Sequence, residues 1–375
     1  MGTVIRPSRL REVGIGLSLV LTSVTFSLLV GELLVRALSD DPKRWEFENF
    51  VTYPSRADGR WNVMQPHPLL GWEPRPGYSG TNHGGEKLLT FDDRGLRVHR
   101  RDAPAPNFEA LPVLVMGDSY AMGEEVADEE TFPAHLQDLL DRRVLNGGVA
   151  GYGLDQVILR AEMIVPLLRP GVLVVSFISD DVRRTQERIL WGIETPYFEV
   201  ADGRLRLRNV PVPPSTPQPL DAFRRIAGYS FLIDLIMAKL DLLDYWLQGQ
   251  PRQREAAHAE GDRVSCLLMD RLRQLGDANS MGVLVVAQYT PLAWTNESTR
   301  RFEVEDTELV LQCAERNGLQ TLDTGAAVEA AVRAGTIDHY YNEAHMNNAG
   351  NRLTAELIAT YLLAQKEGRP GNEPD

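Results

Sequence analysis

The sequence predicts an α/β fold with a doubly wound parallel sheet, preceded by a helix that crosses a membrane. Short apolar runs recur from residue 112 onward, and most of them are separated by a helical pattern. Strands that alternate with helices in this way form a parallel sheet with helices on both faces. An uncharged apolar run close to the N-terminus supplies the second part of the prediction.

The composition is that of a folded acidic protein. Of the 375 residues, 43% are hydrophobic and 24% are charged, and the formal net charge is -13. A chain of this length and hydrophobicity can bury a full α/β core. Nucleic-acid binding requires a basic surface, so we expect no nucleic-acid partner.

The N-terminal residues predict a membrane anchor. Three arginines precede an uncharged run over residues 13–31. The run is long enough to cross a bilayer as a helix, and it is longer than the apolar core of most cleavable signal peptides. We therefore expect a cytoplasmic stub over residues 1–12 and an uncleaved transmembrane anchor over residues 13–35. The bulk of the chain would then be periplasmic or exposed at the cell surface. Cleavage near Ala37 is the alternative.

Residues 36–110 are expected to form a β-rich linker or appended segment. This stretch is rich in proline, glycine and aromatic residues, and it lacks a long helical period. Residues 67–74 and 88–92 have the pattern of short strands and turns. We expect a small β-element that packs on the main domain and carries no chemistry of its own.

The main domain is expected over residues 111–366. Its predicted strands lie at residues 113–116, 143–145, 172–178, 282–289 and 319–322. The clearest predicted helices lie at residues 131–141, 154–168 and 348–364. The last residues, 367–375, are expected to be a disordered tail.

An insertion at about residues 191–259 breaks the alternation of strands and helices. Residues 197–208 predict a hairpin that turns at Asp202-Gly203. Residues 229–246 predict an apolar helix, but its charged residues argue against a second membrane span.

Two cysteines, Cys266 and Cys313, fall in predicted helices. We expect two buried free thiols, with a disulfide as the alternative in an exported protein. Since the cysteines and histidines form no cluster in the sequence, we expect no zinc site.

Ligands of an open parallel sheet bind beyond the carboxyl ends of its strands, so these ends are candidate sites. The first strand ends in Gly117-Asp118-Ser119. A serine in this turn can attack a carbonyl group, and its N–H can help to hold the oxyanion. A serine that caps a helix is the alternative. The second strand leads into a glycine-rich loop at residues 146–153, where backbone N–H groups can approach an anion.

Acidic residues and a histidine stand at two further strand or helix ends. Asp180 and Asp181 follow the third strand, where they could bind a metal or cap a helix. His345 precedes the last predicted helix, with Glu343 two residues before it. A histidine that a carboxylate orients can act as the base for a serine nucleophile. Asp338 is the second candidate for the orienting acid.

Taken together and in order, these blocks resemble the SGNH (GDSL-like) hydrolases. The blocks are Gly117-Asp118-Ser119, the loop that contains Gly151, the strand end with Asp180-Asp181, and residues 343–347. Upstream of them, the apolar span and the stretches LLGWEPRPG and FDDRGLR resemble the membrane-anchored branch of this family. The resemblance covers about residues 112–364, with the insertion between two blocks.

The resemblance implies a flavodoxin-like sheet and acyl transfer that uses neither a metal nor an organic cofactor. Ser119 would be the nucleophile, His345 its base, and Glu343 the acid that orients the base. The oxyanion would be held by the N–H groups of Ser119 and Gly151 and by the side chain of the third block. That block has Asp180 where the family has an asparagine, and an ionised carboxylate cannot donate a hydrogen bond.

Three interpretations of Asp180 are open. Apolar surroundings could hold it protonated, activity could be low, or a shifted register could put Ser179 in its place. The predicted function is a serine-dependent ester hydrolase or acyl (acetyl) transferase that acts on ester-bearing envelope carbohydrates or lipids. The alternative is a catalytically inactive relative that binds a glycan or a lipid.

Overall fold

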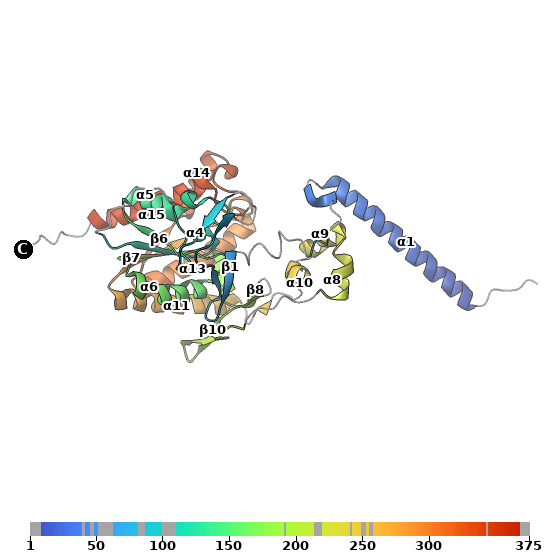
Figure 1. The fold of residues 1–375 in the computed structure, drawn as a ribbon, viewed down its shortest axis with the longest axis horizontal. Coiled ribbons are helices and arrows are strands. Elements are labelled where there is room, and N and C mark those ends of the chain that lie inside the picture. The colour runs from blue at the N-terminus through green and yellow to red at the C-terminus, as the bar shows by residue number, and fades with distance from the viewer. Residues whose placement is uncertain are drawn as a thin grey trace, which may run out of the picture. The chain divides into compact units, whose positions relative to one another are not determined.

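The computed structural model describes most of the chain, in two compact units. The described residues are 9–39, 42–45, 49–51, 63–81, 87–99, 110–190, 193–213, 220–240, 242–248, 253–254, 258–342 and 344–367. The first unit, termed the anchor unit, comprises Met1–Ala57 and Pro217–Pro251. The second, termed the sheet unit, comprises Asp58–Thr216 and Arg252–Asp375 (Figure 1).

The sheet unit is built on five parallel strands. They are β5 (Val113–Met116), β6 (Val144–Asn146), β7 (Val172–Phe177), β13 (Gly282–Ala287) and β14 (Gln320–Asp323). Their order across the sheet is β6-β5-β7-β13-β14. In chain order this is 2-1-3-4-5, the flavodoxin-like order of a doubly wound sheet. The predicted fold class is confirmed, and the strand ends differ from the prediction by only one or two residues.

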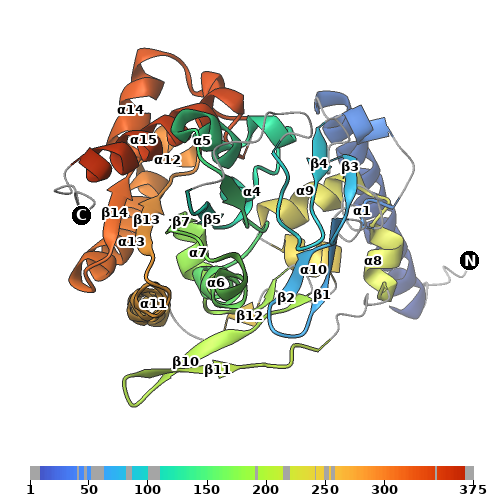
Figure 2. The ribbon, with the colours of Figure 1, turned by 60° about the vertical axis from the view of Figure 1, so that its left-hand side comes forward.

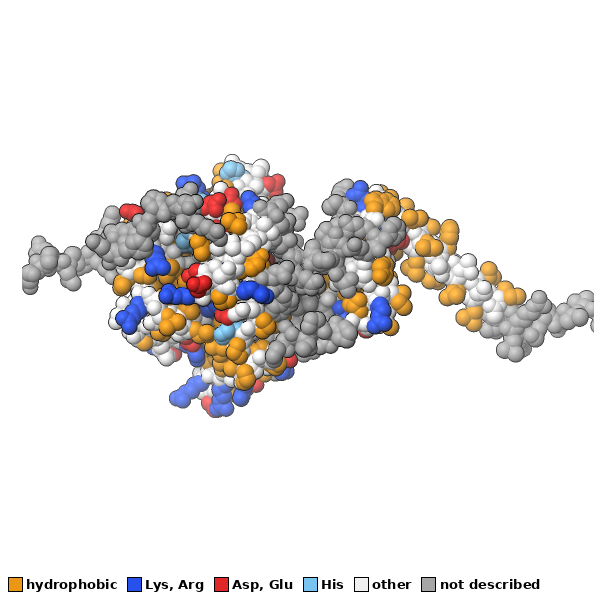
Figure 3. Space-filling view, viewed as in Figure 1, with side chains coloured by type: hydrophobic (Ala, Val, Ile, Leu, Met, Phe, Trp, Pro, Cys, Tyr) orange, Lys and Arg blue, Asp and Glu red, His pale blue; other side chains and the backbone are white. Residues whose placement is uncertain are grey.

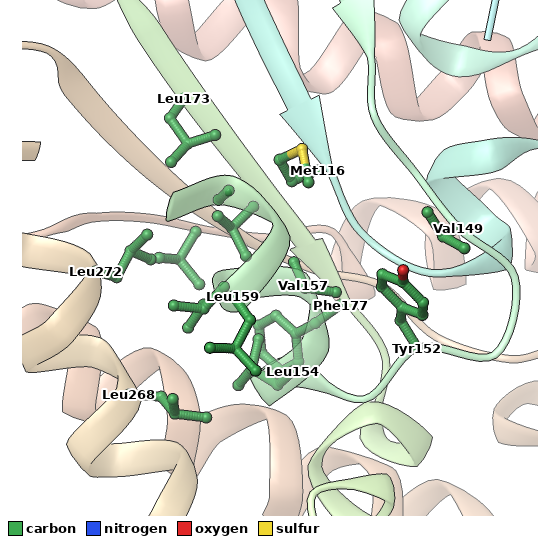
Figure 4. Close-up of a cluster of buried hydrophobic side chains, with 14 of the residues drawn as sticks. Met116, Val149, Tyr152, Leu154, Val157, Leu159, Leu173, Phe177, Leu268 and Leu272 are labelled. Carbon is green, nitrogen blue, oxygen red and sulfur yellow. The ribbon is translucent and has the colours of Figure 1, made fainter. Parts of the chain in front are cut away.

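Helices cover both faces of the sheet (Figure 2). One layer contains α6 (Leu154–Leu168), α11 (His258–Asn279) and α13 (Glu297–Arg316), and the other contains α5 (Phe132–Leu140), α14 (Gly325–Ala334) and α15 (Asn348–Glu367). Side chains of β5 alternate between them: Leu114 and Met116 join the first core, and Val113 and Val115 join the second. Figure 4 shows Met116 in the first core. Burial on both faces explains why the strands are continuous apolar runs.

The chain direction across the sheet reverses between β5 and β7. From β5 the chain first goes outward to β6 and then returns to β7 on the other side of β5. Ligands of doubly wound sheets bind at such a switch point. Two short helices, α4 (Ser119–Met122) and α7 (Ser179–Arg184), begin there directly after their strands. The other short helices of this unit are η2 (Asp128–Glu130), α12 (Leu292–Thr295) and η3 (Ile337–His339).

A disulfide joins α11 to α13. It connects Cys266 with Cys313, whose Cα atoms lie 5.1 Å apart. The expectation of two free thiols was wrong, because only the packing of the two helices brings the sulfur atoms together. The bond links positions 47 residues apart, and it restricts the unfolded chain accordingly.

The residues before the sheet form two small antiparallel pairs. β1 (Met64–His67) pairs with β2 (Gly71–Pro74), and β3 (Ser79–Thr81) pairs with β4 (Leu88–Thr90). Trp72 and Phe91 are buried in the same core as α6 and α11. The β-element expected from the sequence is therefore present, and it completes the core of the sheet unit.

The insertion is divided between the two units. In the sheet unit, β8 (Glu187–Leu190), β9 (Ile193–Glu194) and β12 (Gln253–Arg254) form a small antiparallel sheet. β10 (Tyr197–Ala201) and β11 (Arg204–Arg208) form the predicted hairpin. Its turn residues Asp202 and Gly203 both have positive φ, as a type I′ hairpin turn requires. The helices of the insertion belong to the anchor unit.

The anchor unit consists of helices. They are α1 (Arg9–Leu38), η1 (Pro42–Trp45), α8 (Ala222–Ala227), α9 (Phe231–Lys239) and α10 (Leu243–Gln248). Trp246 is fully buried with Val51 and Ala227 in a small core. Residues Gly14–Leu38 of α1 are the one candidate membrane span in the described part of the chain, and Figure 3 shows hydrophobic side chains along it. Residues 1–8 and 368–375, which hold much of the predicted stub and tail, lie outside the described residues.

Candidate active site

Ser119 lies at the carboxyl end of β5, in the turn that leads into α4. The side chain of Asp118 caps this helix by accepting a hydrogen bond from the Tyr120 N–H at 2.9 Å. The cap is therefore supplied by the residue before Ser119, which leaves the serine hydroxyl available for another partner. Ser119 is only 6% exposed, so the hydroxyl is largely shielded from bulk water.

His345 lies beside this hydroxyl. Its Nε2 is 2.9 Å from Ser119 Oγ, within hydrogen-bonding distance. Tyr120 holds the histidine in place: the two rings are in contact, with centroids 5.3 Å apart. The Tyr120 hydroxyl also donates to the carbonyl oxygen of Ala344 at 2.9 Å. The residue after the serine thus supports both the ring and the backbone of the histidine.

Glu125 holds the second ring nitrogen of His345. Its Oε1 lies 2.7 Å from Nδ1. Glu124 is more distant, with Oε2 3.8 Å from Nε2. Glu125 follows α4 in the chain, and no spacing in the sequence relates it to His345. The structure places this carboxylate where a serine–histidine pair has its orienting acid.

Hydrogen bonds and neighbouring charges shift the pKa values of His345 and Glu125. Burial lowers the pKa of His345, but the hydrogen bond with Glu125 and the charges of Glu124, Glu125 and Asp118 outweigh burial, so the pKa is raised above 6.5. The bond with His345, aided by one from Asn342, lowers the pKa of Glu125. Glu125 is therefore ionised at neutral pH, and it stabilises a proton on His345.

The Ser119 hydroxyl has two acceptors within reach. One is His345 Nε2, and the other is Asp118 Oδ2 at 3.2 Å. When Nε2 carries no proton, it accepts a hydrogen bond from the serine hydroxyl. When Nε2 is protonated, it donates to Oγ, and the hydroxyl then turns to Asp118. Deprotonation of His345 thus turns the serine hydroxyl toward Nε2.

The glycine-rich loop after β6 lies against the turn that carries Ser119. The Val149 N–H donates to the Gly117 carbonyl at 3.0 Å, and a Cβ on Gly148 would collide with the backbone of α4. Gly151 has a φ of 76°, which glycine adopts without strain. Within the described part of the chain, the N–H groups of Ser119 and Gly151 have no protein acceptor. Free N–H groups of this kind can bind an oxyanion.

Asp181 has a structural role at the third strand end. It is fully buried, and its carboxylate accepts from the Ile178 N–H at 3.1 Å and pairs with Arg184 at 2.7 Å. Burial and the charge of Asp118 raise the pKa of Asp181, while Arg184 opposes this effect. The helix-cap interpretation therefore describes Asp181, which closes the first turn of α7.

Asp180 is half-buried, and its carboxylate pairs with Arg183 and Arg184. Two arginines favour the ionised form of a carboxylate. The interpretation that apolar surroundings keep Asp180 protonated therefore has no support in its contacts. Ser179, the residue of the shifted register, is fully buried, and its hydroxyl has no hydrogen-bond partner among the described residues.

Trp72, from the upstream stretch LLGWEPRPG, supports the glycine-rich loop. Its indole Nε1 donates to the carbonyl of Ala150 at 3.1 Å, next to Gly151. The hydroxyl of Tyr152 donates back to the carbonyl of Trp72. The sequence predicts no chemical role for this stretch, but Trp72 positions a loop of the site.

Arg97, from the upstream stretch FDDRGLR, supports the loop that carries Glu125. It is buried, and its guanidinium donates to the carbonyls of Met122 at 2.6 Å and Val126 at 2.7 Å. It also donates to the carbonyl of Gly123 and pairs with Asp128 at 3.0 Å. These carbonyls lie on both sides of Glu124 and Glu125 in the chain, so Arg97 fixes the backbone that presents them.

The sequence suggested two other acids as partners of His345, and of these the structure describes Asp338, which makes no contact with His345 among the described residues. Asp338 is exposed in η3, and its backbone carbonyl accepts from the Asn347 side chain. Glu343 lies outside the described residues. A cavity of about 590 Å³ opens beside Glu125, and its lining includes Lys87, Asp338, Asn342 and Arg352.

No model of a protein family matches the chain, and no curated protein matches it either. Several solved structures do match. One is an α/β hydrolase enzyme from the metagenome of Lake Arreo, Spain, which is 15% identical. That match covers 70% of this chain and 97% of the other, with a TM-score of 0.41.

Two further matching structures are of bacterial proteins. A catalytic mutant of an acetylxylan esterase from Geobacillus stearothermophilus is 14% identical, with a TM-score of 0.39; the match covers 67% of this chain and 93% of the other. A structure described as a putative lipolytic protein of the G-D-S-L family, from Desulfitobacterium hafniense, is 13% identical, with a TM-score of 0.36. That match covers 67% of this chain and 98% of the other. At these identities the similarity concerns the fold.

Proposed function

We propose that this chain is a serine-dependent ester hydrolase or acyl transferase in which Ser119 carries the acyl group. The observation that supports the proposal most is the pair of hydrogen bonds from Ser119 Oγ through His345 to Glu125, at 2.9 and 2.7 Å. A hydroxyl, an imidazole and a carboxylate in this order let the serine lose its proton as it attacks.

The reaction begins with neutral His345, whose Nδ1–H donates to Glu125. Ser119 Oγ attacks the ester carbonyl carbon, its proton passes to Nε2, and the electron pair of the carbonyl bond moves onto oxygen. The tetrahedral intermediate then collapses, and the leaving alcohol takes the proton from Nε2. Water or an acceptor hydroxyl attacks the acyl-enzyme in the same way, with His345 again as base and then as acid.

The oxyanion would be bound by the N–H groups of Ser119 and Gly151. A single donor of this kind is worth about 3–4 kcal/mol. Asp180 occupies the sequence position of a third donor, but a carboxylate donates no hydrogen bond. Its ion pairs with Arg183 and Arg184 offset its charge. We therefore expect a modest rate of ester turnover.

The surroundings of His345 favour a neutral substrate with a polar alcohol portion. Glu124 and Glu125 would repel an anionic ester, and the cavity beside Glu125 is lined mainly by polar side chains. An acetylated carbohydrate of the cell envelope has these properties. The transfer of acetyl groups between an envelope ester and a carbohydrate hydroxyl would use the same acyl-enzyme as hydrolysis.

The same proposal places the sheet unit outside the cytoplasm. α1 contains a candidate membrane span, and the disulfide between Cys266 and Cys313 suits an oxidising compartment. The sheet unit would thus act on esters of the envelope while α1 holds the chain at the membrane.

The first test is the hydrolysis of short-chain nitrophenyl esters by the detergent-solubilised full chain. We expect Ser119→Ala to reduce turnover to the background rate, because the nucleophile is removed. Ser298→Ala is the matched control, because Ser298 is exposed on α13 and should have no effect on turnover. Equal rates in wild type and Ser119→Ala, with an acetylated donor and a carbohydrate acceptor present as well, would contradict the proposal. They would favour an inactive glycan- or lipid-binding protein.

A further inference from the structure

The end of α1 is built into the fold of the anchor unit. The Glu32 side chain accepts hydrogen bonds from the Ser230 hydroxyl at 2.7 Å and from the N–H groups of Phe231 and Leu232 at 2.8 and 2.9 Å. Glu32 thus caps the first turn of α9 from a different helix. The helices also pack directly, because a Cβ on Gly31 would lie 3.1 Å from Leu232 Cδ2.

This contact fixes the depth of α9 relative to the candidate span. Gly31 lies seven residues before the end of the span at Leu38, a distance of about 10 Å along a helix. The span of 25 residues is about 37 Å long, and the hydrocarbon core of a bilayer is about 30 Å thick. If α1 crosses a bilayer, the start of α9 therefore lies below the headgroups of the leaflet that surrounds the end of α1.

The surfaces of α8 and α9 suit that depth. Their exposed large apolar side chains are Phe223, Ile226, Leu235 and Ile236, and Ile226 is 77% exposed. Tyr229 and Leu240, next to these helices, are exposed as well. Within residues 222–227 and 231–239, which the structure describes in full, the exposed charged side chains are Arg225 and Lys239, both basic. Long basic side chains can reach the headgroups while the apolar face stays in the acyl region.

A groove connects this surface with the span itself. Its volume is about 820 Å³, and its lining includes Leu28, Leu29 and Leu33 of α1, together with Phe223, Ile226 and Tyr229. Since three of these residues belong to the candidate span, the groove lies in a bilayer if α1 crosses one. An apolar groove open to a bilayer is filled by lipid acyl chains.

We infer that α8 and α9 lie in the plane of the membrane, inserted into the leaflet at the carboxyl end of α1, with acyl chains of that leaflet in the groove. The buried charge network explains how Glu32 is tolerated in the span, since Arg36 and three donors of α9 satisfy it. The insertion therefore supplies a second membrane contact that does not cross the bilayer. This inference depends on the anchoring role of α1 and is independent of ester chemistry.

The test uses single labelled cysteines in the full chain, reconstituted in phosphatidylcholine vesicles. Cys266 and Cys313 are bonded to each other, so an introduced cysteine is the free thiol that an NBD label modifies. The position tested is Ile226→Cys. Leu21→Cys, inside the span, reports on the anchor, and Asp202→Cys, in the exposed hairpin turn of the sheet unit, reports on the aqueous phase. Far-UV circular dichroism and a single symmetric peak in size exclusion check that each labelled protein is folded.

We expect lipids with a doxyl group near the headgroup end of the acyl chain to quench the label at Ile226→Cys, and aqueous iodide to leave it nearly unquenched. The label at Asp202→Cys should respond in the opposite way. Iodide quenching at Ile226→Cys, with lipid quenching at Leu21→Cys, would overturn the inference while the anchor stands. Absence of lipid quenching at both positions would overturn the anchor as well. Shielding of the label at Ile226→Cys from both quenchers would overturn the inference about α8 and α9, since a second copy of the chain would then cover this face.

Discussion

At the residue scale, three acids control the protonation of His345. Glu125 bonds to Nδ1, and Glu124 and Asp118 add negative charge, so the pKa of His345 is raised above 6.5 despite burial. The neutral imidazole is the form that accepts the serine proton. Ester turnover should therefore fall as the pH drops through the raised pKa and reach its plateau above it.

We predict that Glu125→Gln lowers kcat/KM for a nitrophenyl ester by a factor on the order of 10²–10⁴. The amide leaves the histidine near its place, but it no longer stabilises the imidazolium. The pKa of His345 should fall with the loss of the charge, so the acid limb of the pH profile should move to lower pH. Both effects appear in kcat/KM measured between about pH 5 and 9.

Three related substitutions serve as controls for the orienting acid. Glu124→Gln removes a nearby charge without breaking the Nδ1 hydrogen bond, so we expect less than about a tenfold loss in kcat/KM. Glu343→Gln and Asp338→Asn test the two acids that the sequence suggested. A larger loss in either of them than in Glu125→Gln would assign the orienting role to that acid.

We predict that Asp180→Asn raises ester turnover at neutral pH, by up to about 100-fold if the amide reaches the oxyanion. The substitution removes a negative charge and adds an N–H donor at the strand end. Arg184 keeps its partner Asp181, so the local structure should persist. Steady-state kcat is the measurement, and an unchanged or lower rate would place Asp180 away from the reacting carbonyl.

The residues of the site differ in how well the sequence reveals them. Ser119 and His345 each stand at the end of a strand or the start of a helix, and these positions can be predicted from apolar runs. Glu125 lies 220 residues from His345, in a loop whose path depends on the left-handed turn at Gly123 and on Arg97. No local pattern encodes that approach, so the structure was needed to find it.

At the scale of elements, the loops of the site are held by the segment that precedes the sheet. Arg97 binds carbonyls on both sides of the two glutamates, and Trp72 binds the loop that contains Gly151. The segment before the sheet thus positions loops of the site in addition to completing the core. The sequence showed these strands but not their contacts, because a buried hydrogen bond to a backbone carbonyl leaves no periodic pattern.

We predict that Arg97→Lys lowers kcat about tenfold or more with little change in KM. An ammonium group can still pair with Asp128, but it cannot reach the several carbonyls that the planar guanidinium binds. The loop that contains Glu125 should become more mobile, so the hydrogen bond between Glu125 and His345 should weaken. The acid limb of the pH profile should therefore shift in the same direction as in Glu125→Gln.

Arg94→Lys is the matched control for Arg97→Lys. Arg94 lies on the same segment and is exposed, so its replacement should leave kcat and the pH profile unchanged. If Arg97→Lys lowers only the melting temperature and preserves the pH profile, Arg97 stabilises the fold and does not position Glu125.

At the scale of the whole molecule, the chain comprises a sheet unit that contains the proposed active site and an anchor unit made of two distant segments. Apolar runs buried on both faces made the five strands and their helices predictable from the sequence. The pairing of Cys266 with Cys313 and the assembly of α8 and α9 with α1 were not predictable, because each depends on helix packing between segments far apart in the chain. The spacing of apolar residues in the sequence predicts a helix, but it does not show against which segment that helix packs.

The assembly of the anchor unit bears on whether α1 is removed. Arg36 is 4% exposed, and its guanidinium donates to the carbonyls of Arg44 and Tyr229. Cleavage near Ala37 would remove both Arg36 and Glu32, and it would leave the first N–H groups of α9 without their acceptor. A disposable signal peptide does not supply such contacts to the mature fold. We therefore predict that the mature protein retains α1.

Two measurements check this prediction. The intact mass of protein extracted from membranes should be that of the full chain, and the protein should stay in the membrane pellet after an alkaline carbonate wash. Glu32→Ala should lower stability by about 1–2 kcal/mol, because it removes the acceptor of the first two N–H groups of α9. Thr22→Ala should not, since among the described residues the Thr22 hydroxyl bonds to the carbonyl of Ser18 within α1. An intact mass that corresponds to a chain beginning near residue 38, together with a Glu32→Ala variant as stable as wild type, would show that α1 is a cleaved signal peptide.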